Sequence, residues 1–337
     1  MKQKTLTMPL LAGLLACGAL VTSAHAELSQ ITVARQYGVS YLPLMVMQQE
    51  KLIEKQAKAE GIANLKVDWV KFAGGNVMND ALISDSLQFA SGGVGPLVKI
   101  WAKTKGNLNV KAVSALNAMP LYLNTRNPNV KTVKDFTDKD KIALPAVKVS
   151  IQAVTLQMAA AQAFGEDNYD KLDKYTVTMS HPDGMTALLS GAGEVDSHFT
   201  SPPFQYKELE DPHVHTVLSS FDVLGGPATF NVIWTTSKFR KDNPKLYKAF
   251  TAALAEAIDK INKDKKWGAE EYIKAANSKD SVDFIYKILT DPKVEFTMTP
   301  KATTKYSDFL YKVGAIKVKP QSWKDMFFSN VHGLPGS

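Results

Sequence analysis

The order of secondary-structure signals constrains this sequence more than any other feature. In its first part, stretches of alternating apolar and polar residues, typical of strands, are separated by stretches with a helical apolar period. Strands that alternate with helices build a largely parallel sheet with helices on both faces, so the sequence predicts a three-layer α/β unit. The expected strands are 31–35, 65–70, 87–90 and 110–116, and the expected helices are 42–60, 76–83 and 96–104.

A second unit of the same kind is expected after Pro120. Ser150 is the expected cap of its first helix, which Gly165 ends. The run Ala81-Leu82-Ile83-Ser84 has a counterpart in Ala187-Leu188-Leu189-Ser190, and each run precedes a strand that ends in small polar residues. This similarity predicts two alike lobes whose strand ends face each other across a cleft, with chance similarity as the alternative. The expected strands are 142–144, 175–179 and 195–200, and the second expected helix is 183–189.

The last part of the chain reads as one strand followed by helices. The helix that opens at Asn243-Pro244 carries an apolar stripe from Leu246 to Ile261, which indicates core or inter-lobe packing. The expected strand is 230–235, and the further expected helices are 267–277, 280–290 and 303–313.

The N-terminal residues 1–26 have the pattern of a secretory signal peptide. Lys2 and Lys4 precede an apolar stretch, and Ala24-His25-Ala26 forms an A-x-A cleavage site. Two alternatives stay open, a membrane anchor and a lipid tether on Cys17, but cleavage after Ala26 is favoured. Export to the periplasm is therefore expected. Because Cys17 is the only cysteine in 337 residues, a disulfide framework and a cysteine zinc site are excluded.

The composition of the basic residues and the absence of known catalytic motifs argue against several other functions. Of 40 basic residues only three are arginine, which argues against a nucleic-acid partner. No G-x-S-x-G, H-E-x-x-H or Walker A motif is present, so we expect no enzyme activity and no cofactor. His213 and His215 alternate as a metal pair would, but they follow Pro212 in a polar turn, and no metal site is expected there.

Glycine-rich turns follow the strands of the first unit and precede its helices. They lie at Gly38, at 73–76 and at 91–95. Backbone N–H groups at helix starts carry partial positive charge and bind anions, and ligands of open α/β sheets bind beyond the carboxyl ends of the strands. Ser150 and the pair Thr200-Ser201 supply similar positions in the second unit. These turns predict an anion site between the two units.

A set of short motifs is informative through its order and spacing along the chain. The motifs are Tyr41-Leu42-Pro43-Leu44, Val70-Lys71-Phe72-Ala73-Gly74-Gly75, Phe89-Ala90-Ser91-Gly92-Gly93-Val94-Gly95-Pro96, Ala187-Leu188-Leu189-Ser190-Gly191, Gly193-Glu194-Val195-Asp196, Pro202-Pro203 and Pro320-Gln321-Ser322-Trp323-Lys324-Asp325. In these motifs the chain resembles the substrate-binding proteins of ABC importers in the nitrate/sulfonate/taurine group, which share a thiamine-pyrimidine-synthase-like fold. The resemblance covers nearly all of the chain after residue 26, but Asp85 and Gln88 depart from it, since the family shows glycine and an acid there.

The resemblance implies a type II periplasmic-binding fold of two three-layer α/β lobes joined by a two-segment hinge. Such proteins bind a small solute between the lobes, close by hinge motion and deliver the solute to a membrane permease, and a monomer is expected. We place the crossing segments near 117–120 and 225–229. The expected division is 1–26 signal peptide, 27–117 lobe 1, 118–227 lobe 2 and 228–337 a return to lobe 1.

Arg35 is the first candidate for a ligand-binding residue. It follows Ile31 and Val33 on one strand face near the strand end, and its planar fork suits a sulfonate or carboxylate. The alternative is a structural ion pair. For Ser150 a purely capping role, and for His198 a core role, are also open. The full candidate set is Arg35, Gln36, Tyr37, Gly38, Asn76, Gly93, Val94, Asn117, Ser150, Gln152, His198, Thr200 and Ser201.

The favoured ligand is a small anion that resembles a sulfonate, taurine or nitrate. A neutral heteroaromatic such as a thiamine pyrimidine precursor is the alternative, with Tyr37, Tyr41 or Phe204 as stacking platforms. An exported enzyme on the same fold is the alternative of another class.

Overall fold

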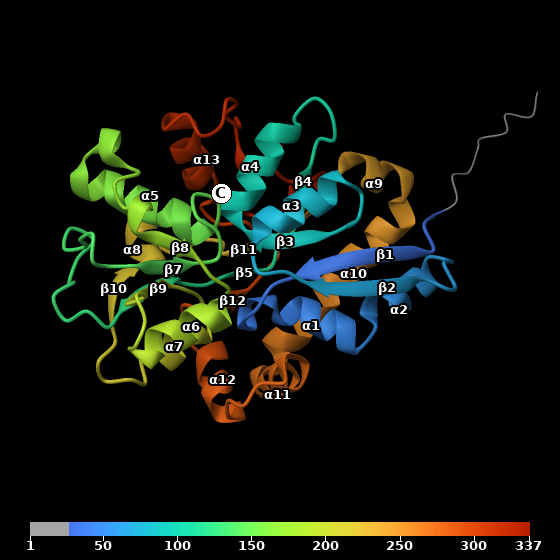
Figure 1. Cartoon of the computed structure of the whole chain (residues 1–337). Helices are drawn as coiled ribbons and strands as arrows, with labels where there is room; N and C mark the ends of the chain where they lie inside the picture. The colour runs from blue at the N-terminus through green and yellow to red at the C-terminus, as the bar shows by residue number, and fades with distance from the viewer. Residues whose placement is uncertain (1–26) are drawn as a thin grey trace, which may run out of the picture.

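The computed structural model describes residues 27–337, and two five-stranded sheets form its two lobes (Figure 1). The predicted signal peptide and Cys17 lie outside the described residues. In lobe 1, β1 and β2 run parallel, and β11 lies antiparallel between β3 and β4. A parallel bridge between Val33 and Phe89 joins the two parts, which gives the order β2-β1-β3-β11-β4. The strands are β1 Gln30–Arg35, β2 Lys66–Lys71, β3 Ala90–Gly93, β4 Lys111–Ala115 and β11 Asn231–Thr235.

Lobe 2 repeats this arrangement with strands from the middle of the chain. Its order is β8-β7-β9-β6-β10, with β7 parallel to β8 and β9, and β6 antiparallel to β9 and β10. Each position therefore has a counterpart in lobe 1, including the antiparallel strand in fourth place. The predicted α/β class with two alike sheets is confirmed. The strands are β6 Tyr122–Thr125, β7 Ile142–Leu144, β8 Thr176–Thr178, β9 Ser197–Phe199 and β10 His215–Ser219.

The helices predicted in the two lobes are present with one difference, and the short helices α7, α8 and α9 were not predicted. The helix expected over 42–60 is two helices, because Lys51 adopts a left-handed conformation with φ 51° between them. Ser150 caps α5 as expected, since its Oγ accepts from the backbone N–H of Ala153 at 3.2 Å. Lobe 1 has α1 Leu42–Gln49, α2 Leu52–Ala59, α3 Gly75–Ile83, α4 Val94–Thr104, α9 Ser237–Asp242 and α10 Pro244–Lys263; lobe 2 has α5 Ile151–Phe164, α6 His181–Ser190, α7 Phe204–Glu208 and α8 Ser220–Leu224.

The C-terminal segment contacts both lobes. In lobe 2, Thr155 Oγ1 of α5 lies 3.1 Å from the Tyr306 hydroxyl of α13, and in lobe 1, Trp101 Nε1 of α4 donates to Asp325 O at 3.0 Å. In Figure 1, α11 and α12 lie on one side of the junction between the lobes and α13 on the other. The remaining elements are α11 Lys265–Ala276, α12 Val282–Leu289, α13 Thr303–Lys312, the strand pair β5 Asn117–Ala118 and β12 Glu295–Phe296, and the 3-10 turns Val39–Tyr41, Glu166–Asn168, Asp173–Tyr175, Trp323–Asp325 and Ser329–Val331.

A carboxyl pair in lobe 2 makes folding stability depend on pH. Burial, followed by the hydrogen bond and charge of Asp140, raises the pKa of Asp196 to about 6. Hydrogen bonds from Thr137 and Asn127 outweigh the effect of burial and lower the pKa of Asp140. Because folding raises the pKa of Asp196, its contribution to stability is complete below pH 4 and is lost as the pH rises through 6.

Replacing Asp196 by asparagine is expected to remove this loss. The side-chain oxygen of the asparagine would keep the hydrogen bonds from Lys141 N and Ser197 Oγ, and its amide N–H would donate to Asp140 without a charge. Urea unfolding at pH 7.5 is expected to show a gain of about 1–2 kcal/mol for Asp196→Asn, and at pH 4 the variant and wild type should nearly coincide. The exposed Asp167→Asn variant is the control. Equal differences at both pH values would contradict this account.

Candidate functional site

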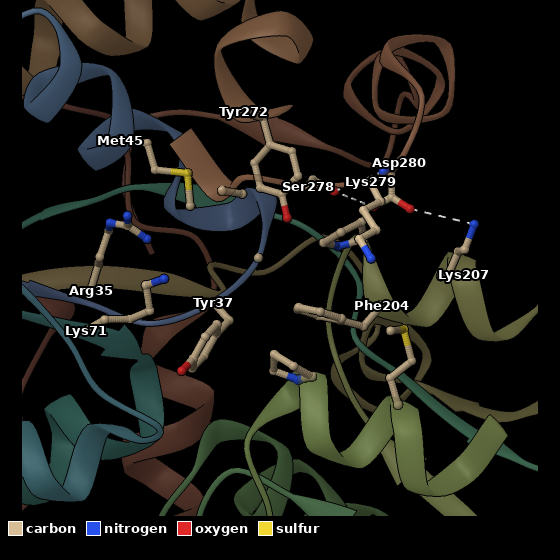
Figure 2. A pocket seen from close by; sticks show the side chains of 15 residues that line it. Arg35, Tyr37, Met45, Lys71, Phe204, Lys207, Tyr272, Ser278, Lys279 and Asp280 are labelled. Atoms are coloured by element: carbon tan, nitrogen blue, oxygen red, sulfur yellow. Dashed lines mark hydrogen bonds and ion pairs between the residues drawn. The ribbon is translucent and has the colours of Figure 1, made fainter. Parts of the chain in front are cut away.

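A cavity at the junction of the two lobes has a volume of about 440 Å³ (Figure 2). We call it the outer cavity. Lobe 1 supplies the end of β1, the following turn, α1 and the end of β2; lobe 2 supplies α6 and the start of α7; α11 and the segment after it complete the wall. This volume is typical of small-molecule sites. Its lining residues are Arg35, Tyr37, Gly38, Met45, Lys71, Pro182, Met185, Pro203, Phe204, Lys207, Tyr272, Ala276, Ser278, Lys279 and Asp280.

Arg35 faces this cavity as a buried cation that has no partner among residues 27–337. Its residue is 7% exposed, and its guanidinium makes no hydrogen bond or ion pair with any residue of the described range 27–337. Within this range, the structural ion pair considered from the sequence is therefore not formed. Burial lowers the pKa of Arg35, whereas the nearby Tyr272 and Tyr37 oppose that effect. A buried guanidinium without a counter-charge is costly, so the site favours an anion.

Lys71 adds a second positive charge at the same end of the cavity. It is the register partner of Arg35 in the parallel pair of β1 and β2, so both side chains leave the sheet at its carboxyl edge. Partial burial and the charge of Arg35 lower the pKa of Lys71, and its Nζ lies 5.1 Å from the centre of the Tyr37 ring. Figure 2 shows Arg35 and Lys71 side by side.

The opposite end of the outer cavity is closed by an ion pair between lobe 2 and the segment after α11. Lys207 Nζ lies 3.6 Å from Asp280 and 2.8 Å from Glu210. Asp280 also accepts from Ser278 Oγ at 2.9 Å, so its charge is compensated. The lining therefore holds four cations and one carboxylate, which leaves the cavity positive.

A much smaller cavity of about 10 Å³, the inner cavity, lies deeper between the lobes. Gln36 and Gly93 of lobe 1 line it together with Ser150 and Gln152 of lobe 2, so four predicted site residues do meet. The space is small because the lobes touch: a Cβ at Gly93 would lie 2.4 Å from Ile151 Cγ2. The inner cavity has room for about one water molecule.

A buried hydrogen-bond chain runs from the inner cavity into lobe 2. Gln152 Nε2 lies 3.3 Å from His181 Nε2, and His181 Nδ1 lies 3.0 Å from Thr200 Oγ1 and 3.3 Å from His198 Nε2. His198 Nδ1 in turn lies 2.6 Å from a carboxylate oxygen of Glu208. Burial and the charge of His198 lower the pKa of His181 well below its usual range. The predicted residues His198 and Thr200 are thus occupied by internal contacts.

The remaining predicted residues are placed in three different ways. Tyr37 and Gly38 line the outer cavity, whereas Asn76 is exposed and Val94 is buried. Asn117 is also buried, and its amide donates to Ser40 O at 2.6 Å and accepts from Asn231 N at 3.2 Å. Ser201 Oγ is buried and has no hydrogen-bond partner among residues 27–337.

Twelve of the fifteen residues that line the outer cavity, among them Lys71, Tyr272 and Lys279, were not in the predicted set. Lys71 ends a strand whose alternation was recognised, and its position opposite Arg35 follows once β1 and β2 are paired in register. Tyr272 and Lys279 come from α11 and the segment after it, and the sequence gives no signal that this region returns to the cleft.

The geometry of the site is suited to holding a charged solute. Thr200 and His181 form a hydroxyl–imidazole pair, but both are buried and the adjacent inner cavity holds no substrate-sized space. The carboxyl pair of Asp140 and Asp196 lines neither cavity.

Residues 27–337 contain no group of three or more His, Asp or Glu that could hold a metal ion. None of the helices in that range is long and apolar enough to cross a membrane.

No family model and no curated protein matches the sequence of this chain. Solved structures do match its fold. The alkanesulfonate-binding protein SsuA from Xanthomonas axonopodis pv. citri, bound to MOPS, superimposes with a TM-score of 0.68 at 16% identity, over 86% of this chain and 95% of that one. The Candida albicans CA3427 gene product, described as having the generic periplasmic binding protein fold, gives 0.64 at 19% identity, over 87% and 92%. This chain has the periplasmic binding protein fold.

The periplasmic nitrate-binding protein NrtA from Synechocystis PCC 6803 is a further neighbour, with a TM-score of 0.67 at 13% identity over 89% of this chain and 84% of that one. The fold implied by the resemblance of the sequence is therefore confirmed, since sulfonate- and nitrate-binding proteins share it. These neighbours are mainly substrate-binding proteins and not enzymes.

Proposed function

We propose that this chain is a periplasmic solute-binding protein of an ABC importer, which binds a small anion between its two lobes and delivers it to a membrane permease. The observation that carries the proposal is Arg35, a buried cation without a partner in residues 27–337 that faces a cavity of about 440 Å³. The sulfonate- and nitrate-binding neighbours support an anionic ligand.

The mechanism follows from the position of the outer cavity between two lobes. An anion paired with Arg35 and Lys71 of lobe 1 would also touch Phe204 of lobe 2, so it stabilises the closed arrangement. Opening then requires movement about the crossing segments, which we place near 117–120 and 225–229. In this proposal the chain acts as a monomer exported by its signal peptide, and no bond of the solute is made or broken.

A thermal unfolding screen tests this proposal. The protein is purified, refolded to remove any bound solute, and heated with MOPS, taurine, an alkanesulfonate, nitrate or a pyrimidine at millimolar concentration. A true ligand at about a hundred times its Kd adds about 2.7 kcal/mol to stability, which raises the Tm by several degrees. We expect such a shift with a sulfonate or another anion. A shift with pyrimidines alone would replace the anion by a neutral heteroaromatic, and no shift at all would contradict the proposal.

A further inference from the structure

In the outer cavity, two positively charged side chains lie at one end and the aromatic rings lie in the middle. Arg35 and Lys71 lie at one end, and Tyr37, Tyr272 and Phe204 surround the space between that end and Lys279 (Figure 2). These rings come from three regions that are far apart in sequence: the turn after β1, α11 and the start of α7. The arrangement offers one end for a charge and a middle for an apolar body.

The wall around the rings is also apolar. Met45, Pro182, Met185 and Pro203 complete it, and Tyr272 is only 4% exposed. The Phe204 ring is held in place from behind by the imidazole of His181, with 5.7 Å between ring centres and 27° between planes. Aromatic rings that line a pocket favour flat ligands, which they contact by stacking or edge to face.

The size of the two cavities sets the size of the solute. The inner cavity of about 10 Å³ cannot take it, because Ile151 packs against Gly93. The outer cavity of about 440 Å³ would be left mostly unfilled by an anion as small as nitrate. The solute must therefore bring an organic body of its own, and that body lies against α11 and not at the strand ends of the inner cavity.

We propose that the solute is an organic anion with a flat aromatic body, whose charged group pairs with Arg35 and Lys71 and whose ring lies among Tyr37, Tyr272 and Phe204. This inference rests on the proposed function, because it names the substrate class of the same site. It assigns Tyr272 and Phe204 as specificity-determining residues, and it joins the anionic and the aromatic ligand hypotheses in one molecule.

Calorimetric titration with matched probes tests the inference. The refolded protein is titrated with benzenesulfonate against methanesulfonate, benzoate against acetate, and the neutral benzenesulfonamide. We expect each aryl anion to bind at least tenfold more tightly than its methyl counterpart, and the neutral sulfonamide to bind at least tenfold more weakly than benzenesulfonate. Phe204→Leu and Tyr272→Leu are each expected to weaken benzenesulfonate about tenfold and methanesulfonate less than twofold.

The control variant is Tyr286→Leu, which changes a tyrosine that is 40% exposed and lies outside the cavity. Circular dichroism checks that each variant is folded. Because two ring variants are made, the test remains valid if one of them fails to fold. If methyl and aryl anions bind equally and neither ring variant changes their ratio, the inference is wrong while the proposed function stands. If no anion of either kind binds, the proposed function itself fails. Tight binding of benzenesulfonamide would contradict the charged end of the ligand.

Discussion

Replacing Arg35 by methionine is expected to abolish anion binding and to stabilise the empty protein at the same time. The variant removes a buried charge that pairs with no group in residues 27–337, and methionine fills the same space with apolar atoms. Loss of a buried charge pair costs about 2–5 kcal/mol in binding, so the Kd should rise at least 30-fold. Unfolding of the empty variant should require about 1–3 kcal/mol more than unfolding of the wild type. Titration calorimetry and urea unfolding measure the two effects.

The opposite signs of these effects separate a binding residue from a structural one. A structural arginine would lower stability when replaced and would leave the affinity unchanged, and that pair of results would contradict the role given to Arg35. Lys103→Met is the matched control, because Lys103 is an exposed cation of lobe 1 outside both cavities. It is expected to change neither quantity measurably.

A side chain at Gly93 is expected to hold the lobes apart. The added Cβ of Gly93→Ala would lie 2.4 Å from Cγ2 and 2.5 Å from Cβ of Ile151, the first residue of α5 in lobe 2. The backbone of Gly93 has φ −67°, so alanine causes no local strain. The steric conflict with Ile151 therefore opposes closure of the two lobes. We expect the affinity for the anion to fall about 10–100-fold and the radius of gyration of the protein with ligand to be larger than that of the wild type with ligand.

Two further variants complete this experiment. Gly333→Ala is the control, because no atom lies within 4 Å of a Cβ placed there. The double variant Gly93→Ala, Ile151→Gly removes the isoleucine side chain that the new methyl group would meet, and it should recover most of the lost affinity. Small-angle scattering and calorimetry give both readouts. An affinity unchanged in Gly93→Ala would show that closure at this contact is not coupled to binding.

The sequence was sufficient to predict a helix or strand where the pattern that defines it lies within its own residues. The strand at 142–144 and the helix that Ser150 caps agree with the structure because an apolar run, a cap and a helical apolar period each lie within one short segment. The strands β6 and β10 were missed, because each is defined by its partners across the sheet. The break at Lys51 was missed as well, since neither glycine nor proline marks it.

The candidate site could be predicted from the sequence only in part. Arg35 was found because its strand alternates and ends at the carboxyl edge of the sheet. The glycines were expected as backbone donors to an anion, whereas Gly38 and Gly93 also lie where lobe 2 comes close: a Cβ at Gly38 would lie 2.7 Å from Pro202 O. The position of Tyr272 in the wall of the outer cavity depends on how α11 packs against the cleft, and no local sequence pattern predicts that packing.

Calorimetric titration of the refolded wild type and of Arg35→Met with sulfonates tests the central claim most directly. The account predicts that the wild type binds one anion per chain and that Arg35→Met binds none at the same concentrations, while the empty variant is at least as stable as the wild type. Equal affinity of the two proteins for the same anion, or no binding of any anion by the wild type, would contradict the role given to Arg35.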